Sequence, residues 1–185
     1  MRAMKEQVIL RDGRSVLVRA AHAGDGTGVV KLMRSVADER GYTLFEPEEM
    51  DAKAEAIAAR VGASDRDELR LIARCGDGDD DVIGDLSIGT KNFRRIAHVA
   101  KLGMEIRHDY RGVGLGDAMI RMALAWAKAH PRVARVELQV FADNVPAIAL
   151  YRKHGFVQEG RRRYYMRMGD RYLDDLIMAA FVKTP

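Results

Sequence analysis

The chain has 185 residues, a length typical of one domain, and it contains 48% hydrophobic and 31% charged residues. This composition is too apolar for a disordered chain and too polar for a membrane protein, and no apolar run approaches the roughly 20 residues that span a bilayer. The net charge of +4 does not indicate nucleic-acid binding over the whole surface. We therefore expect one globular domain.

The first part of the chain predicts a hairpin followed by two helices. Short apolar runs at Val8–Leu10 and Val16–Val18 flank Asp12-Gly13, a pair typical of a two-residue hairpin turn. Residues 27–40 carry apolar side chains at helical spacing. A second helix is expected to begin at Pro47, because proline suits the first helical position.

From residue 68 onward the pattern changes to strands interrupted by two helices. The expected elements are strands at 69–74, 82–88 and 96–106, a helix over 114–130, a strand at 136–140, a short helix from Asn144 to Gly155, and a hairpin over 156–181 that turns at Gly169-Asp170. The resulting order, ββααβββαβαββ, predicts a mixed α/β domain with a central sheet.

Export, disulfides and metals are not expected. Residues 1–6 contain no apolar signal-peptide core, which favours a cytoplasmic protein. The one cysteine, Cys75, cannot form an internal disulfide and lacks the spacing of a zinc site. The five histidines form no ligand cluster in the sequence, so we expect no metal requirement.

A glycine-rich turn joins the predicted strand 96–106 to the helix that follows it. Gly112, Gly114 and Gly116 are spaced by single residues, which lets the backbone approach a ligand at a helix start, where free N–H groups favour phosphate. A P-loop would require Lys-Ser/Thr after Gly116, and a Rossmann fingerprint would require glycine at Asp117. The turn therefore indicates a phosphate site of another kind.

Two segments resemble the GNAT acetyltransferase superfamily. Arg111-Gly-Val-Gly-Leu-Gly116 resembles its Arg/Gln-x-x-Gly-x-Gly/Ala signature, and Asn144–Phe156 resembles its second cofactor segment, Asn-x-x-Ala-x-x-Leu-Tyr-x-x-x-Gly-Phe. The order of elements agrees as well. The resemblance is specific over about 96–160 and is greatest to the branch of ribosomal-protein and amino-acid N-acetyltransferases.

The resemblance implies an acyl-CoA N-acyltransferase fold over residues 1–185. In this fold a mostly antiparallel sheet is flanked by helices, and the family's fourth and fifth strands, here 96–106 and 136–140, splay apart around acetyl-CoA. The implied reaction moves an acetyl group from acetyl-CoA to a primary amine of a small molecule or protein by direct nucleophilic attack, without a metal. Because dimers are frequent in the superfamily, a homodimer is compatible with the resemblance.

The family motifs also imply a role for individual residues. Pantetheine would pair with the backbone at the end of one strand, at Met104, Glu105 and Ile106. The pyrophosphate would bind the glycine turn, which consists of Arg111, Gly112, Val113, Gly114, Leu115 and Gly116. Asn144, a helix cap, would hydrogen-bond the pantetheine amides. Tyr151 is the implied catalytic residue, because its hydroxyl would give a proton or a hydrogen bond to the leaving thiolate.

The sequence leaves the general base and the acceptor open. The candidates for the base are His98, Glu105, Glu39, Glu46 and a water chain. The acceptor pocket is expected from segments 20–50, 90–97 and 160–170, with candidate lining residues Tyr42, Phe45, Tyr164 and Tyr165.

Two other readings come from different functional classes. One is a non-catalytic acyl-CoA-binding sensor or interaction domain, which would not need Tyr151. The other is nucleic-acid binding through Arg161–Arg163, and no recognisable nucleic-acid-binding motif accompanies this cluster.

Overall fold

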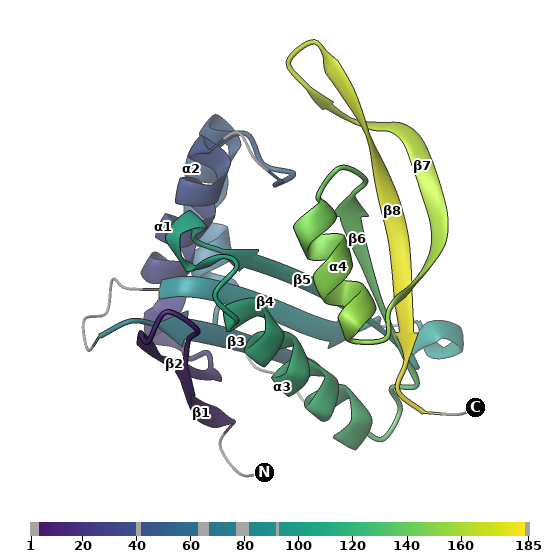
Figure 1. Ribbon diagram of the computed structural model, residues 1–185, viewed down its shortest axis with the longest axis horizontal. Coiled ribbons are helices and arrows are strands. Elements are labelled where there is room, and N and C mark those ends of the chain that lie inside the picture. The colour runs from purple at the N-terminus through teal and green to yellow at the C-terminus, as the bar shows by residue number, and fades with distance from the viewer. Residues whose placement is uncertain (1–3, 40–41, 63–66, 77–81, 92, 184–185) are drawn as a thin grey trace. The chain divides into compact units, whose positions relative to one another are not determined.

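The elements follow the predicted order along the chain (Figure 1). A computed structural model describes residues 4–39, 42–62, 67–76, 82–91 and 93–183. Within them the strands are β1 (Lys5–Ile9), β2 (Ser15–Ala20), β3 (Glu68–Arg74), β4 (Val82–Thr90), β5 (Val99–Ile106), β6 (Arg135–Phe141), β7 (Val157–Met168) and β8 (Arg171–Phe181). The α-helices are α1 (Gly26–Asp38), α2 (Pro47–Arg60), α3 (Leu115–Ala129) and α4 (Val145–Lys153), and short 3-10 turns occur at Ala23–Asp25, Arg94–Ile96 and His108–Tyr110.

The strands form a mixed sheet in the order β1-β2-β3-β4-β5-β6-β8-β7. Antiparallel pairing joins β1 to β2, β2 to β3, β6 to β8 and β7 to β8, whereas β5 and β6 run parallel. Parallel neighbours need a long crossover connection, which α3 supplies between β5 and β6. The predicted class, a mostly antiparallel α/β sheet, is confirmed.

Several boundaries differ from the prediction by one to three residues. The strand predicted from residue 96 begins at Val99, because Arg94–Ile96 forms a 3-10 turn in which the Ile96 N–H donates to the Phe93 carbonyl at 3.0 Å. The first helix ends at Asp38, and its predicted end near residue 40 lies outside the described residues.

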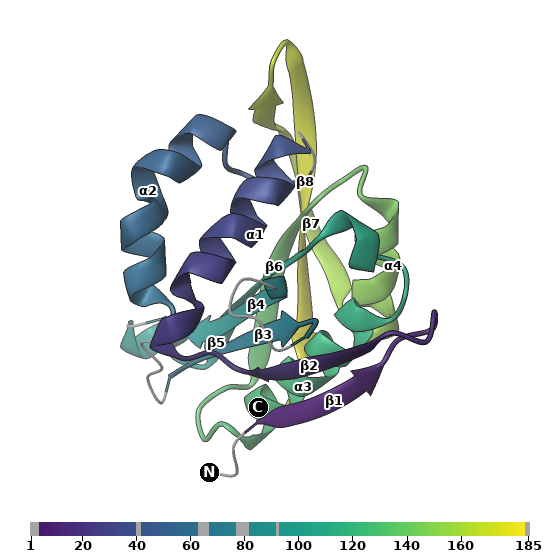
Figure 2. The same ribbon diagram turned by 90° about the vertical axis from the view of Figure 1, so that its left-hand side faces the viewer.

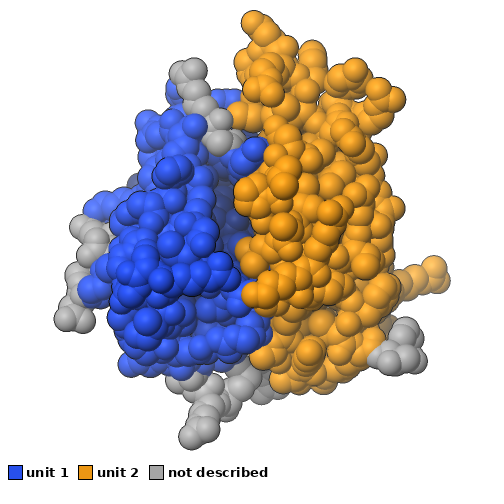
Figure 3. Space-filling model, viewed as in Figure 1, with its two compact units in different colours: residues 1–87, 104–123 blue, residues 88–103, 124–185 orange. Residues whose placement is uncertain are grey.

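The chain divides into two compact units, residues 1–87 with 104–123 and residues 88–103 with 124–185 (Figure 3). In the first unit α1 and α2 lie side by side (Figure 2), and the core between them includes Leu32 of α1, Met50 of α2 and Ile72 of β3. A Cβ on Gly84 of β4 would lie 3.0 Å from the Met119 sulfur, so α3 covers the opposite face of these strands.

In the second unit the parallel strands pair over a short distance only. The register of β5 and β6 joins Val99–Lys101 to Arg135–Glu137. On its other edge, β6 pairs with β8 along its whole length, from Arg135 to Phe141. A small pocket of about 120 Å³ opens where the parallel pairing stops, lined by Lys101, Glu137, Leu138, Gln139 and Ile177. This early end of the pairing is what the predicted splay requires.

Candidate functional site

The glycine turn presents a row of backbone donors. Gly112 and Gly114 have φ angles of 74° and 101°, which glycine adopts without the Cβ clash that other residues suffer. The N–H groups of Gly112 through Gly116 donate to no residue in the part of the chain that the structure describes, and the first N–H groups of α3 have no partner one turn earlier. This loop can therefore bind an anion through its backbone.

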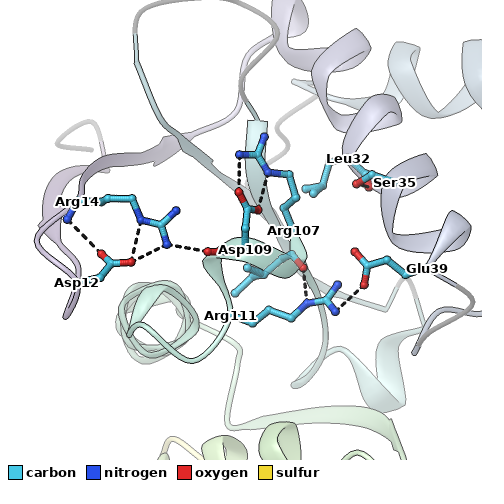
Figure 4. Close-up of polar contacts among 9 residues, drawn as sticks. Asp12, Arg14, Leu32, Ser35, Glu39, Arg107, Asp109 and Arg111 are labelled. Atoms are coloured by element: carbon cyan, nitrogen blue, oxygen red, sulfur yellow. Dashed lines mark hydrogen bonds and ion pairs between the residues drawn. The ribbon is translucent and has the colours of Figure 1, made fainter.

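The β1–β2 turn braces this loop. The Arg11 N–H donates to the Val113 carbonyl at 2.9 Å, and the Arg14 guanidinium donates to the Asp109 carbonyl at 2.6 Å (Figure 4). The Arg14 guanidinium also lies 3.9 Å from the centre of the buried Tyr110 ring. These contacts fix the loop before any ligand arrives, which reduces the ordering cost of binding.

Arg111 and Glu39, two residues predicted for separate tasks, form an ion pair (Figure 4). The Arg111 Nε donates to the Ile106 carbonyl at 2.7 Å, and its Nη1 lies 2.7 Å from a Glu39 oxygen at the end of α1. The Arg111 N–H donates to the His108 carbonyl at 3.2 Å. The side chain of Arg111 thus ties β5 and the glycine turn to α1, a contact between distant residues that no local signal indicates.

A row of charged residues crosses three neighbouring strands of the first unit. Arg70 of β3 donates from Nε and Nη2 to the two oxygens of Asp85 of β4, both at 2.7 Å. The Arg107 N–H donates to the Ile83 carbonyl at 3.0 Å. Strands β4 and β5 are neighbours joined by a short connection and are therefore antiparallel, so this bond places Glu105 opposite Asp85 on the same face.

This charged row lies on the face that α1 and α2 cover. Ile72, two residues from Arg70 on β3, packs against those helices. Gly84 points to α3, so the adjacent Asp85 points the other way. Arg70 and Asp85 were not among the predicted site residues, although charged residues inside apolar strands are a signal for such a row.

Glu105 is the member of this row without a cation of its own. The residue is half-buried, but its Oε2 atom is closed to solvent and has no hydrogen-bond partner among the described residues. Burial, followed by the Asp85 charge, raises the pKa of Glu105 to about 7, with Arg70 acting in the opposite direction. Such a carboxylate can accept a proton at neutral pH.

Asn144 and Tyr151 lie on α4 of the second unit. The Asn144 Oδ1 accepts the Ala147 N–H at 3.2 Å, so the predicted helix cap is confirmed. Tyr151 is 6% exposed, and its ring packs edge-on against Phe156 at 5.8 Å between centroids. Burial raises the pKa of Tyr151 to about 12, so its phenol stays protonated at neutral pH.

The other candidate residues lie in more exposed places. His98 precedes β5 and is exposed, and so is Glu46, the residue that caps the start of α2. Phe45 packs against the core of α1 and α2. Tyr42, Tyr164 and Tyr165 are exposed aromatic residues. Their predicted roles in proton transfer or acceptor binding stay predictions.

The basic cluster on β7 is largely neutralised within its own hairpin. Arg161 forms an ion pair with Asp174 at 2.7 Å, and Arg162 donates to Asp175 from Nε at 2.8 Å. Two of the three arginines therefore serve the hairpin itself. Within the described ranges, no group of three His, Cys, Asp or Glu residues is placed to hold a metal, and no helix is long and apolar enough to cross a membrane.

A model of the acetyltransferase (GNAT) family matches residues 31–156, which include the glycine turn and α4. This chain belongs to the GNAT family. It is an acetyl-CoA-dependent N-acetyltransferase, as predicted. Nothing in the comparisons favours the non-catalytic alternative.

Named relatives of this GNAT enzyme include two N-acetyltransferases. It is 35% identical over 116 residues to the L-amino acid N-acetyltransferase AaaT of Escherichia coli, an alignment that covers 63% of this chain and 70% of that protein. It is 25% identical over 179 residues to an N-alpha-acetyltransferase of Sulfurisphaera tokodaii, with 92% and 95% of the two chains covered.

Solved GNAT structures share the fold. An acetyltransferase from Streptococcus pneumoniae superposes with a TM-score of 0.76 and 26% identity, over 91% of this chain and 99% of that one. The Salmonella typhimurium acetyltransferase yncA, solved with acetyl-CoA, superposes with a TM-score of 0.76 and 15% identity, over 92% and 95%.

Replacing Gly114 by valine should weaken acetyl-CoA binding about tenfold or more. A branched side chain is strained at a φ of 101° and would project from the open side of the loop, where the nearest atoms belong to Arg11 at 3.9 Å. Tenfold corresponds to about 1.4 kcal/mol, close to one lost hydrogen bond to a charged group. Calorimetry with acetyl-CoA measures the change.

The matched control is Gly169→Val in the β7–β8 turn. Gly169 also has a positive φ, 58°, and a Cβ there meets nothing within 4 Å. This variant places the same side chain at a positive φ in a turn far along the chain from the glycine loop, and it should bind acetyl-CoA like the parent. Unchanged affinity in a folded Gly114→Val protein would contradict the role of the loop.

Proposed function

We propose that this enzyme acetylates an α-amine, either of a free L-amino acid or of a polypeptide N-terminus, with Glu105 as general base. The observation that carries the chemistry is the Glu105 carboxylate, whose Oε2 is closed to solvent and lacks a partner among the described residues. The α-amine is supported by the two relatives, one named for L-amino acids and the other for N-alpha acetylation. Residues 1–185 are proposed to form one N-acetyltransferase domain.

In the proposed reaction each residue has a limited task. The N–H groups of Gly112–Gly116 hold the pyrophosphate of acetyl-CoA, the backbone of Met104–Ile106 pairs with pantetheine, and Asn144 bonds the pantetheine amides. The acceptor nitrogen forms a bond to the acetyl carbon while the carbon–sulfur bond breaks. Glu105 takes the proton that the nitrogen loses, and the sulfur leaves as a thiolate.

Glu105 fits the task of base better than the other candidates. A general base must be partly ionised at the working pH, and it must bind a proton tightly enough to take one from the acceptor nitrogen. A pKa of about 7 meets both needs. Glu39 is engaged by Arg111 at 2.7 Å, while His98 and Glu46 are exposed.

Tyr151 is proposed to donate a hydrogen bond to the leaving thiolate and to keep its own proton. An ordinary thiol has a pKa of about 8.5. Tyr151, with a pKa of about 12, holds its proton more tightly than such a thiol. A hydrogen bond still stabilises the negative charge that develops on sulfur, and solvent then supplies the proton.

An acceptor screen tests the proposed substrate class. Release of CoA thiol would be followed with L-amino acids, with peptides that carry a free N-terminus, and with spermidine and an aminoglycoside. We expect turnover with α-amines and none with the matching Nα-acetylated amino acids. Turnover restricted to spermidine or the aminoglycoside would contradict the α-amine. Tight acetyl-CoA binding without thiol release from any amine would favour the sensor. The cytoplasmic location and the homodimer stay predictions.

A further inference from the structure

The carboxylates of Asp85 on β4 and Glu105 on β5 lie opposite each other, and the Arg70 guanidinium donates hydrogen bonds to Asp85. Both hydrogen-bonding edges of Arg70 are directed at Asp85, with Nε and Nη2 each 2.7 Å from a carboxylate oxygen. Asp85 and Arg70 are themselves nearly buried, with side chains 8% and 17% exposed. The register set by the Arg107–Ile83 bond places Glu105 opposite Asp85. Asp85 therefore holds the cation that Glu105 would otherwise attract.

We propose that Asp85 and Arg70 are positioning residues that together set the affinity of Glu105 for a proton: Asp85 makes the carboxylate a stronger proton acceptor, and Arg70 limits that effect. The inference rests on the proposed role of Glu105 as general base. Asp85 acts in two ways: its negative charge opposes ionisation of Glu105, and its two oxygens keep Arg70 from pairing with Glu105. Neither residue has to touch the substrate for this effect.

Among the described residues, few charged groups act on Glu105. Asp85 of β4 and Arg70 of β3 act on it directly, and Glu68 at the start of β3 acts on Arg70. Arg107, the residue after the end of β5, forms an ion pair with Asp109 at 2.8 Å. At the end of α1, Glu39 is paired with Arg111. The Arg70–Asp85 pair is therefore the element whose alteration should change the affinity of Glu105 for a proton.

Two substitutions should move this affinity in opposite directions. Asp85→Asn removes the opposing charge and releases Arg70 toward Glu105, so Glu105 should ionise at lower pH, by about one pH unit or more. Arg70→Gln removes the cation and leaves two facing carboxylates, so Glu105 should ionise at higher pH by a similar amount. A purely structural role for the pair predicts no such opposite shifts.

The shifts would be measured in two independent ways on the full chain. The first is the carbon-13 chemical shift of the Glu105 carboxyl in protein labelled at glutamate, with its signal assigned by its loss in Glu105→Gln. The second is the acidic limb of the kcat profile against pH, at saturating acetyl-CoA and acceptor. Arg34→Gln, which removes the ion pairs of Arg34 with Asp38 of α1 and Asp51 of α2, is the control and should shift neither.

The readouts separate this inference from the function on which it rests. Opposite shifts of the carboxyl signal, matched by the kcat limb, support both. Opposite shifts of the signal with an unmoved kcat limb support the tuning of Glu105 and overturn its role as base. If the signal does not move in either folded variant, or moves in the same direction in both, the tuning is overturned. Because Asp85→Asn is nearly isosteric, it keeps the test valid should Arg70→Gln fail to fold.

Discussion

Tyr151→Phe is expected to lower the rate of acetyl transfer about 10²–10³-fold, the usual loss when one preorganised donor to a developing anion is removed. The phenol of Tyr151 keeps its proton at neutral pH, since burial raises its pKa to about 12. The hydrogen bond to sulfur strengthens as the thiolate forms, so the loss should fall on the chemical step. Affinity for acetyl-CoA should change little.

Single-turnover kinetics are the appropriate measurement, because product release can limit kcat and hide a chemical defect. Phenylalanine preserves the ring that packs against Phe156 at 5.8 Å, so the fold should be retained. Tyr172→Phe, at an exposed ring of β8, is the control for loss of a phenol elsewhere. A parental single-turnover rate in Tyr151→Phe would mean that another donor serves the sulfur.

Glu105→Gln should reduce kcat by about 10²–10⁴-fold, the range for loss of a positioned general base. In the parent enzyme Glu105 works only when ionised. With its pKa at about 7, kcat at saturating substrates should rise with pH, reach half its maximum near pH 7 and level at higher pH. The glutamine variant cannot titrate there, so its small residual kcat should lack this limb.

The exposed Glu48 on the first turn of α2 provides a control, because Glu48→Gln removes a carboxylate from the same unit without touching the charged row. Its pH profile should match that of the parent. Should Glu105→Gln retain the limb near pH 7 and most of its kcat, the proton would have to leave through a different group or through water.

Local patterns were sufficient to predict the order of elements. Alternating Val136, Leu138 and Val140 predicted β6, and Asn144 predicted the cap of α4 through a bond to a residue three positions away. The glycine turn was predictable for the same reason, because its positive φ angles and its place before α3 depend on consecutive residues. Each of these features is decided within about one turn of helix or one strand.

The charged row was not predictable, because it depends on strand register. Arg70, Asp85 and Glu105 come from three strands, and a slip of one residue between β4 and β5 would turn Glu105 to the other face. The pairing of Arg111 with Glu39, 72 residues apart, likewise exists only after folding. Sequence patterns therefore indicated Glu105 only as one of several candidate bases. Its burial and the neighbouring charges, which follow from the strand register, distinguish it from the other candidates.

The contacts between the β1–β2 turn and the glycine turn have a practical consequence for where this protein can be truncated or tagged. Its donors, Arg11 and Arg14, belong to the β1–β2 turn, whereas the family match begins at residue 31. A fragment trimmed to the matched region would contain every signature residue and still lose the contacts that hold Val113 and Asp109. Family boundaries are therefore poor guides for expressing this enzyme, and a purification tag belongs away from its first hairpin.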